Sequence, residues 1–213
     1  MLGALQFSAP PSSVLIGAVI MRTPDGWHAG VLHLEGVEHK MLHLAWEGDL
    51  RNEGWHPPYA WLAPALHPIR ARSIAALCRL VWRRNQKGGL PYGFAYRHSY
   101  FNGDGELTPG AGERGLTCAT LVLAVFRSAG LELVDLSTWP DRDDDRAWQN
   151  SLAEKLLADV TDEAEKHRVI TEIGAIRVRP SEAAGAMACR LHPAPFVEIR
   201  AEADCIEAQL SRH

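Results

Sequence analysis

Cysteine and histidine are the residues of this sequence whose types and positions could support nucleophilic catalysis. Cys118 follows Thr117, a common helix-capping residue type, and opens an apolar run that ends before Gly130. This pattern predicts a buried helix over residues 118–129 with Cys118 in its first turn. Because a helix N-terminus stabilises a thiolate, we expect a lowered pKa for Cys118, although a purely structural buried cysteine is the alternative. Cys78, in the middle of another predicted helix, is expected to be a core residue.

Two histidines on neighbouring predicted strands could face that cysteine. Residues 27–34 and 39–46 have the composition and alternation of strands, and the four residues between them allow an antiparallel hairpin. In the simplest register His28 and His43 are diagonal neighbours on one face of the sheet, about 7 to 8 Å apart between Cα atoms. His33 has the opposite parity and is expected to point away. A thiol, a base and a group that orients the base are what papain-type catalysis requires.

The same residues carry a resemblance to a known family. The string HAGVLHLEG followed by MLHLAW resembles the catalytic strand pair of NlpC-type papain-like enzymes. The histidines precede the cysteine, which is similar to the circularly permuted branch that includes lecithin:retinol acyltransferase and YiiX-like bacterial proteins. The segment LPYGFAY before LTCATLVLAVFRSAG also resembles the Tyr-containing extended segment of that branch. The resemblance covers about residues 14–133. No Gly-Asp precedes the first histidine strand, and Ala-Thr follows the cysteine, so the substrate class stays open.

The resemblance implies a role for each of these residues. Cys118 would be the nucleophile, with its backbone N–H donating to the oxyanion, His28 the general base and His43 the residue that orients the imidazole. His43 is also a rival for the role of base, because a change of one residue in the turn alters which histidine approaches sulfur. The substrate-binding candidates are aromatic: Tyr92, Tyr96, Trp55 and Trp61. For the tryptophans the alternative is a loop that its aromatic residues hold on the core.

Composition limits the classes of protein that this chain could be. It has 213 residues, 46% of them hydrophobic and 23% charged, and a net charge of −4, which is typical of one globular domain. That charge makes nucleic acid or an anionic membrane surface an unfavourable main partner. The four cysteines form no CxxC pair and indicate reduced thiols, so a cytoplasmic location is the default, and secretion without a signal stays open. The apolar run at 14–21 is too short to span a bilayer, and no signal peptide is evident.

The elements expected around the site give an α+β fold: a papain-like (permuted NlpC-type) antiparallel sheet packed on a central cysteine-bearing helix, with a helical C-terminal extension. Residues 1–13 are a polar lead-in, 14–133 the catalytic core and 134–213 the extension packed on it. Within the core, glycines and prolines indicate a loop at 47–68. Further predicted elements are a strand at 14–21, a turn at 23–26, a helix at 69–85 that buries Ile69, Ser73, Ala76, Leu77, Leu80 and Val81, and an extended segment at 90–101. The acidic run at 141–146 precedes a helix, and helices near 181–187 and 201–210 flank an extended segment at 195–200.

The predicted function is hydrolysis of an amide, in a peptide or a peptidoglycan-like substrate, by a cysteine enzyme that forms a thioester and needs no cofactor or metal. Acyl transfer or the hydrolysis of thioesters or lipids is an alternative, because one thioester mechanism serves all of these reactions. A large apolar funnel beside the cysteine would favour lipids, and a polar open groove would favour peptides. A zinc site made by His28, His43 and Cys118 would be a different class of function. A non-catalytic module that binds a partner through its aromatic loop would be a third class.

Overall fold

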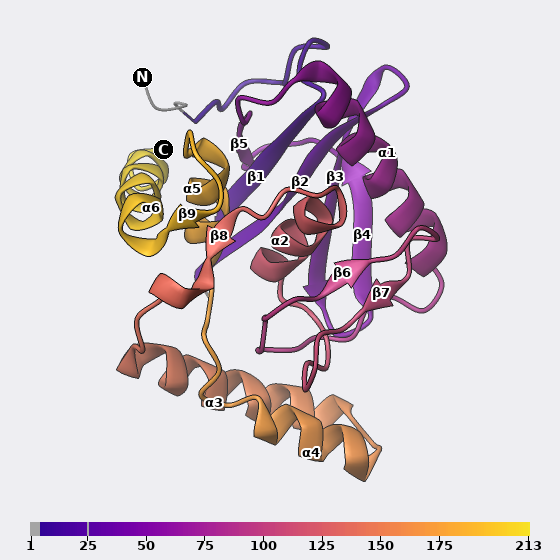
Figure 1. Cartoon of the computed structure of the whole chain (residues 1–213), viewed down its shortest axis with the longest axis vertical. Coiled ribbons are helices and arrows are strands. Elements are labelled where there is room, and N and C mark those ends of the chain that lie inside the picture. Colours follow the sequence, from indigo (N-terminus) through magenta and orange to yellow (C-terminus); the bar gives the residue numbers. More distant parts are fainter. Residues whose placement is uncertain (1–4, 25) are drawn as a thin grey trace.

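The computed structural model describes residues 5–24 and 26–213, and these form an α+β fold around one antiparallel sheet (Figure 1). The sheet has five strands in the order β4-β3-β2-β1-β5. Their bounds are β1 (Ile16–Thr23), β2 (Gly26–Glu35), β3 (Glu38–Trp46), β4 (Asp49–Gly54) and β5 (Ala60–Leu62). The strands expected at 14–21, 27–34 and 39–46 are confirmed as β1, β2 and β3. The expectation of a loop throughout 47–68 is wrong, because β4 and β5 extend the sheet at its two edges.

Six α-helices accompany the sheet within the described residues. They are α1 (Pro68–Asn85), α2 (Cys118–Ser128), α3 (Asp143–Asp159), α4 (Glu163–Thr171), α5 (Pro180–Ala188) and α6 (Phe196–Leu210). A short 3-10 helix, η1 (Leu136–Thr138), follows β8 (Val134–Asp135), which pairs in parallel with β9 (Ala194–Pro195). The expected extended segment at 90–101 is mostly irregular and forms regular strand only at β6 (Tyr100–Phe101), which pairs with β7 (Leu107–Thr108).

Alternation along the strands gives the sheet two apolar faces. One face contributes Ala18, Val31 and Leu42 to the main core, which α1, α2 and α5 cover. Since neighbouring residues of a strand point to opposite faces, Val19, Leu32 and Met41 form a second cluster on the other side. Tyr59 and Trp61 complete that second cluster. The helices therefore cover one face, and the segment around β5 covers part of the other.

The hairpin of β2 and β3 has the register that the sequence predicts. Leu34 pairs with His39 and Glu35 with Glu38, so the chain reverses through Gly36, whose φ of 62° suits glycine. Pairing of the two strands continues as far as Val31 and Leu42. Beyond that pair the strands separate, although β2 extends back to Gly26 and β3 forward to Trp46.

Helix α2 is confirmed as the central buried helix. Its residues from Cys118 to Phe126 are all buried. The Thr117 hydroxyl accepts a hydrogen bond from the N–H of Thr120, whose own hydroxyl accepts one from the N–H of Thr117. This reciprocal cap fixes the start of the helix at Cys118. Gly130, with a φ of 72°, follows the end of the helix as expected.

Helix α1 begins where expected but buries a different face. Its buried residues are Ala71, Ile74, Ala75, Cys78 and Val81, so the predicted stripe is wrong except at Val81. Ile69 is 68% exposed. The observed stripe also has the spacing of one helical face, and its alanines and Cys78 let the helix approach the sheet closely. Cys78 is confirmed as a core residue.

The ends of the chain depart from expectation in two places. The segment at 195–200 is not extended, because α6 begins at Phe196. Pro195 precedes it directly and suits a helix start, where backbone N–H groups have no partner within the helix and the missing N–H of proline costs no hydrogen bond. Residues 1–4 of the predicted lead-in lie outside the described residues, and Leu5 is a core residue whose N–H donates to Gln209. The lead-in, expected to be only a polar segment, is therefore packed on the core at Leu5.

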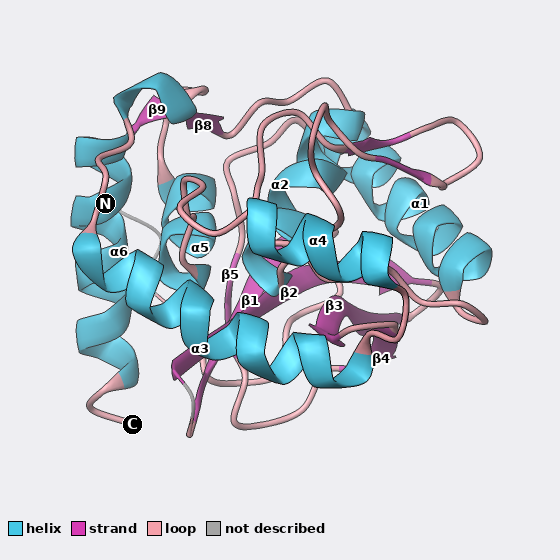
Figure 2. Cartoon of the chain, turned by 90° about the horizontal axis from the view of Figure 1, so that it is seen from below, coloured by secondary structure: helices cyan, strands magenta, loops and turns pink. Residues whose placement is uncertain are grey.

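Helices α3 and α4 lie along one end of the sheet (Figures 1 and 2). A buried carboxylate and an ion-pair cluster attach α4 to the core. Glu172, after α4, accepts hydrogen bonds from the backbone N–H groups of Phe94 and Arg114. The Arg114 guanidinium contacts Glu47 at 2.7 Å and Glu165 at 3.0 Å. These contacts also hold the segment that carries Tyr92. Within the part of the chain described here, no helix has the length and apolar character needed to cross a membrane.

Candidate active site

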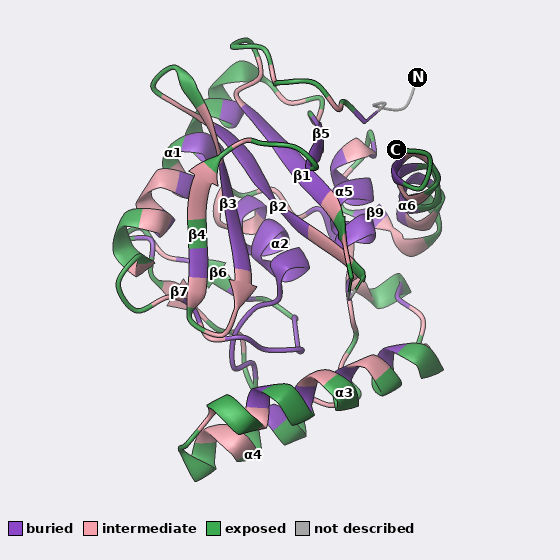
Figure 3. Ribbon diagram, turned by 180° about the vertical axis from the view of Figure 1, so that it is seen from behind, coloured by how far each residue is buried: buried purple, intermediate pink, exposed green. Residues whose placement is uncertain are grey.

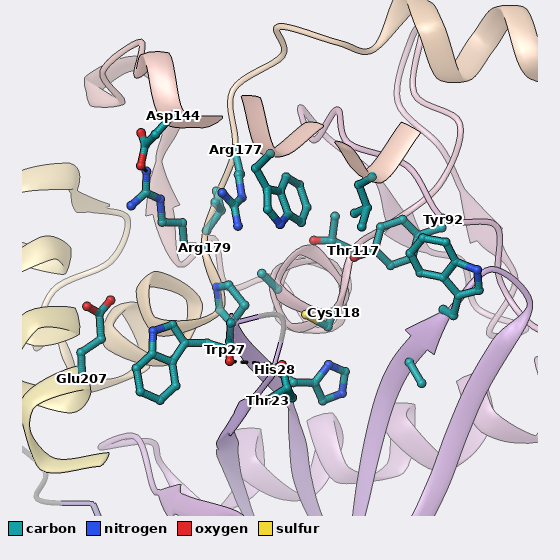
Figure 4. Close-up of a pocket in the computed structure, with 18 residues that line it drawn as sticks. Thr23, Trp27, His28, Tyr92, Thr117, Cys118, Asp144, Arg177, Arg179 and Glu207 are labelled. Carbon is teal, nitrogen blue, oxygen red and sulfur yellow. Dashed lines mark hydrogen bonds and ion pairs between the residues drawn. The ribbon is translucent and has the colours of Figure 1, made fainter. Parts of the chain in front are cut away.

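Cys118 is the first residue of α2 and lines a pocket of about 420 Å³ (Figure 4). The pocket lies between the ends of β2 and β3, the segment of Tyr92, and the walls formed by α3 and the residues before α5. Cys118 itself is only 7% exposed. The backbone N–H groups of Ala29 and Ala119 lie close enough to its sulfur to favour the thiolate. The thiol is thus held against β2 at the N-terminus of the helix.

His28 and His43 project from the sheet face opposite α2. His28 shares the parity of Leu32, and His43 that of Met41, both of which belong to the second apolar cluster. Figure 3, seen from behind, shows α2 in the opening between the diverging parts of β2 and β3. The contact of the Cys118 sulfur with the N–H of Ala29 places the thiol at this divergence. His28 lines the same pocket as Cys118.

The two imidazoles belong to a hydrogen-bonded chain. His28 Nε2 lies 2.8 Å from His43 Nδ1, and His43 Nε2 lies 3.1 Å from an oxygen of Glu53 on β4. Gly30 makes the first contact possible, since a Cβ at that position would lie 2.7 Å from the Cβ of His43. The ring of Tyr59 packs against both imidazoles, with centroid distances of 6.3 and 6.0 Å. The expected shared face of the two histidines is confirmed, but it is the sheet face turned away from α2. The expectation that both imidazoles face the thiol is wrong, because only His28 lines the pocket of Cys118 and the hairpin pattern alone does not fix on which face the helix packs.

Burial keeps both imidazoles neutral. It lowers the pKa of His28 from 6.5 to about 4, with further lowering by His43 and Arg51, while Glu53 opposes the shift. Burial also lowers the pKa of His43, although the hydrogen bond with Glu53 works in the other direction. A neutral His43 that donates from Nε2 to Glu53 has a lone pair on Nδ1, which accepts a hydrogen bond from the N–H at Nε2 of His28. Nδ1 of His28 is then unprotonated and can act as a base.

The thiol does not have the lowered pKa expected from its helix position. Burial raises the pKa of Cys118, and it outweighs the N–H groups of Ala29 and Ala119 and the charge of Arg177, which work to lower it. The thiol of Cys118 and the imidazole of His28, which line the same pocket, are therefore both neutral near pH 7. Burial also raises the pKa of Cys189 to about 11, whereas Cys205 is exposed.

His33 is confirmed on the face opposite to His28. It is buried, and its Nε2 lies 2.8 Å from the side-chain oxygen of Asn52 on β4. That face is the one covered by helices, but His33 is absent from the lining of the Cys118 pocket. The divergence of β2 and β3 explains why His28, and not His33, reaches the same pocket as the thiol.

The four aromatic substrate-binding candidates occupy different places. Tyr92 lines the pocket of Cys118. Tyr96 lines a separate cavity, and its hydroxyl is buried without a hydrogen-bond partner. Trp61 belongs to the second apolar cluster and donates to the carbonyl of Ser8, while Trp55 packs against that cluster. The two tryptophans therefore hold residues 55–61 on the sheet, which is the alternative to substrate binding that the sequence left open. Neither tryptophan lines the pocket of Cys118.

Several residues of the site were not among the sequence-derived candidates. Glu53 ends the hydrogen-bonded chain, and Trp148 and Arg177 form one wall of the pocket. Glu53 could have been found from the sequence, because a tight turn at 47–48 pairs β3 with β4 and places Glu53 opposite Met41, diagonal to His43. Arg177 follows α4 and had no such signal, since its position depends on how the C-terminal third packs.

The described residues contain no group of three or more histidine, cysteine, aspartate or glutamate side chains that could hold a metal ion. The nitrogens through which His28 and His43 face one another are already used in their mutual contact. The zinc alternative therefore lacks a ligand set in this part of the chain. Comparison with known proteins adds no relative: no family model, curated protein or solved structure matches this chain.

Proposed function

We propose that this chain is a cysteine hydrolase that cleaves an amide bond through a thioester, with Cys118 as nucleophile and His28 as general base. The observation that supports the proposal is a hydrogen-bonded chain that begins at His28, in the pocket of a cysteine at a helix N-terminus, and continues through His43 to Glu53. A buried imidazole with a fixed tautomer is what general-base catalysis requires. His43 orients His28, and Glu53 orients His43.

The first half-reaction starts from the neutral pair. His28 Nδ1 takes the thiol proton as the sulfur attacks the carbonyl carbon of the substrate, so charge develops during the attack. The Cys118 N–H, at the start of α2, donates to the oxyanion that forms. Collapse of this intermediate breaks the C–N bond, and the amine leaves with the proton that His28 holds. The acyl group remains on sulfur as a thioester.

The second half-reaction repeats this sequence with water. His28 accepts a proton from the water as its oxygen attacks the thioester carbonyl, and the same N–H stabilises the second oxyanion. The thiolate leaves and recovers a proton from His28. The product is a carboxylic acid, and the enzyme returns to its neutral resting state.

The pocket lining favours a peptide or a peptidoglycan-like substrate over a lipid. Asp144, Arg177, Arg179 and Glu207 lie in the lining together with aromatic side chains. A polar pocket of this kind suits amides and charged groups, whereas a lipid acyl chain requires a largely apolar funnel. This function agrees with the resemblance to permuted NlpC-type papain-like enzymes, and membership of that family is part of the proposal.

Labelling with thiol-directed electrophiles tests the proposal. A panel of peptidyl and long-chain acyl electrophiles should modify Cys118, with the peptidyl compounds reacting faster. Labelling should disappear in Cys118→Ala and fall at least about 100-fold in His28→Ala, since a general base contributes about 10² to 10⁴. The matched control is His33→Ala, which removes a buried histidine of the same strand and should retain labelling at Cys118.

The outcome decides between the candidate functions. Faster reaction with acyl electrophiles would support acyl transfer or lipid hydrolysis on the same residues. Equal loss in His28→Ala and His33→Ala would mean that the base is misassigned. Labelling that is unaffected by either change would rule out catalysis by this site and would favour a binding module.

A further inference from the structure

Arg177 lies in the same pocket as Cys118, on the wall formed by α3 and the residues before α5. Its guanidinium carbon lies 3.6 Å from the ring centroid of Trp148. Figure 4 shows the Arg177 side chain directed into the pocket, while Arg179 extends toward Asp144. Stacking on a rigid indole holds the planar guanidinium in one orientation, which is how arginine is prepared to bind a carboxylate.

The charge of Arg177 is only partly balanced within the protein. Its partner is Asp145, whose Oδ1 lies 3.2 Å from Arg177 and 2.9 Å from Arg179. The other oxygen of Asp145 accepts from Arg142 at 2.6 Å. Asp145 is therefore shared by three guanidinium groups, of which Arg142 also pairs with the buried Glu182 at 2.5 Å and Arg179 with Asp144 at 2.7 Å, whereas Asp145 is the carboxylate that Arg177 contacts. Burial lowers the pKa of Arg177, and the charges of Arg179 and Arg142 act in the same direction, while Asp145 opposes the shift.

The acidic residues of the pocket do not offset this charge. Asp144 pairs with Arg179 at 2.7 Å, and Glu207 pairs with Arg200 at 3.1 Å. Figure 4 shows both at the end of the pocket away from Cys118. The part of the pocket between Cys118 and Trp148 thus has a positive group and aromatic walls, and the charge of Arg177 acts on the thiol itself.

We propose that the substrate carries a carboxylate near its scissile acyl group and that Arg177 binds this carboxylate while Trp148 holds the guanidinium in place. The inference rests on the proposed function and specifies its substrate class as an acidic acyl compound, such as a peptide with an acidic side chain or a free carboxyl end. Bidentate arginine contacts with carboxylates are both strong and directional. Arg177 is therefore a specificity residue, separate from the chemistry of Cys118 and His28.

Two small alkylating reagents of different charge test the inference on the intact chain. Iodoacetate carries the carboxylate and iodoacetamide is its neutral counterpart, so the ratio of their rates at Cys118 cancels any change in thiolate content. We expect the ratio in the unmodified protein to exceed that of a free cysteine peptide by about tenfold, from one charge acting across a partly buried site. Arg177→Gln should return the ratio to the peptide value, and Arg177→Lys should give an intermediate one.

The control is Arg83→Gln, which removes an exposed arginine of α1 and should leave the ratio unchanged. Protection gives a second measurement: glutarate should slow alkylation of Cys118 by iodoacetamide, and glutaramide should not. A ratio equal to that of the free peptide, or an equal ratio in Arg177→Gln and Arg83→Gln, would overturn the inference. These results are distinct from failure of the proposed function, which is detected when His28→Ala leaves labelling by the peptidyl electrophiles unchanged.

Discussion

His28 Nε2 and His43 Nδ1 lie 2.8 Å apart, and a third residue determines which of the two nitrogens donates the hydrogen bond. Glu53 is an acceptor at 3.1 Å from the other nitrogen of His43, so that nitrogen carries the proton. His43 can then only accept from His28, which leaves Nδ1 of His28 as the basic atom. A carboxylate on the edge strand thus determines which nitrogen of a histidine two strands away is unprotonated.

The proposed function gives Cys118 and His28 chemical roles and leaves their neighbours in α2 structural ones. Cys118→Ala and His28→Ala should abolish turnover, while urea unfolding shows a loss of at most about 1 kcal/mol for Cys118→Ala, because only one sulfur is removed. Leu121→Ala, one turn further along α2 and fully buried, should cost about 2 to 5 kcal/mol. An equal loss of stability in Cys118→Ala and Leu121→Ala would make Cys118 a core residue.

Glu53 should affect turnover through the tautomer of His43. Glu53→Ala removes the acceptor, so we expect kcat to fall about tenfold or more with little change in KM, whereas Glu53→Gln keeps a carbonyl oxygen there and should retain most of the activity. Steady-state kinetics on a cleaved peptide measure both constants. Glu38→Ala is the control, because Glu38 is an exposed carboxylate of the same hairpin that pairs with Lys40. If Glu53→Gln and Glu53→Ala are equally impaired, Glu53 acts through its charge and the tautomer argument is wrong.

The acid limit of activity should lie well below that of an ordinary histidine. A general base must be unprotonated, and the pKa of His28 is about 4 instead of 6.5. The value of kcat/KM, which reports the free enzyme, should therefore stay nearly constant from pH 7 down to about pH 5 and fall only as the pH approaches 4. A pH profile of kcat/KM measures this directly. Half-maximal activity near pH 6.5 would contradict the burial of a neutral base.

Stability should also decrease in acid because of the buried histidines. The folded-state pKa values of His28, His33 and His43 are all lowered, so the unfolded chain binds more protons over the range between about 4 and 6.5. The free energy of unfolding therefore falls as the pH drops through 6.5, and His28 alone accounts for up to about 3 kcal/mol of the loss.

Urea unfolding at a series of pH values between 4 and 7.5 measures this dependence. His33→Gln should flatten it, because Gln keeps an amide that can contact Asn52 and does not titrate. His167→Gln, which changes an exposed histidine of α4, should leave the pH dependence unchanged. Equal slopes in all three proteins would contradict the role assigned to His33.

Local patterns in the sequence determined the parts of the site that depend on short-range geometry. The cap at Thr117 and the apolar run after it place Cys118 at a helix start, because capping and burial of an apolar helix are satisfied within a few residues. The register of the β2 and β3 hairpin places His28 and His43 on one face, because side-chain parity and a tight turn leave few other registers. Alternation of apolar and polar residues was less informative around Glu53. The glycines and prolines of residues 47–68 predicted a loop there, although the region contains the two short strands β4 and β5.

Only the tertiary structure decided how these local parts meet. The sequence could not show that β2 and β3 separate beyond Val31 and Leu42, where His28, on the opposite face of the sheet, lines the same pocket as Cys118. Burial of the site was also not evident, and it reverses the pKa shift expected for Cys118, because desolvation depends on every element packed around the thiol. Arg177 lines the pocket through packing of residues nearly sixty positions from Cys118, a long-range arrangement that no local periodicity encodes.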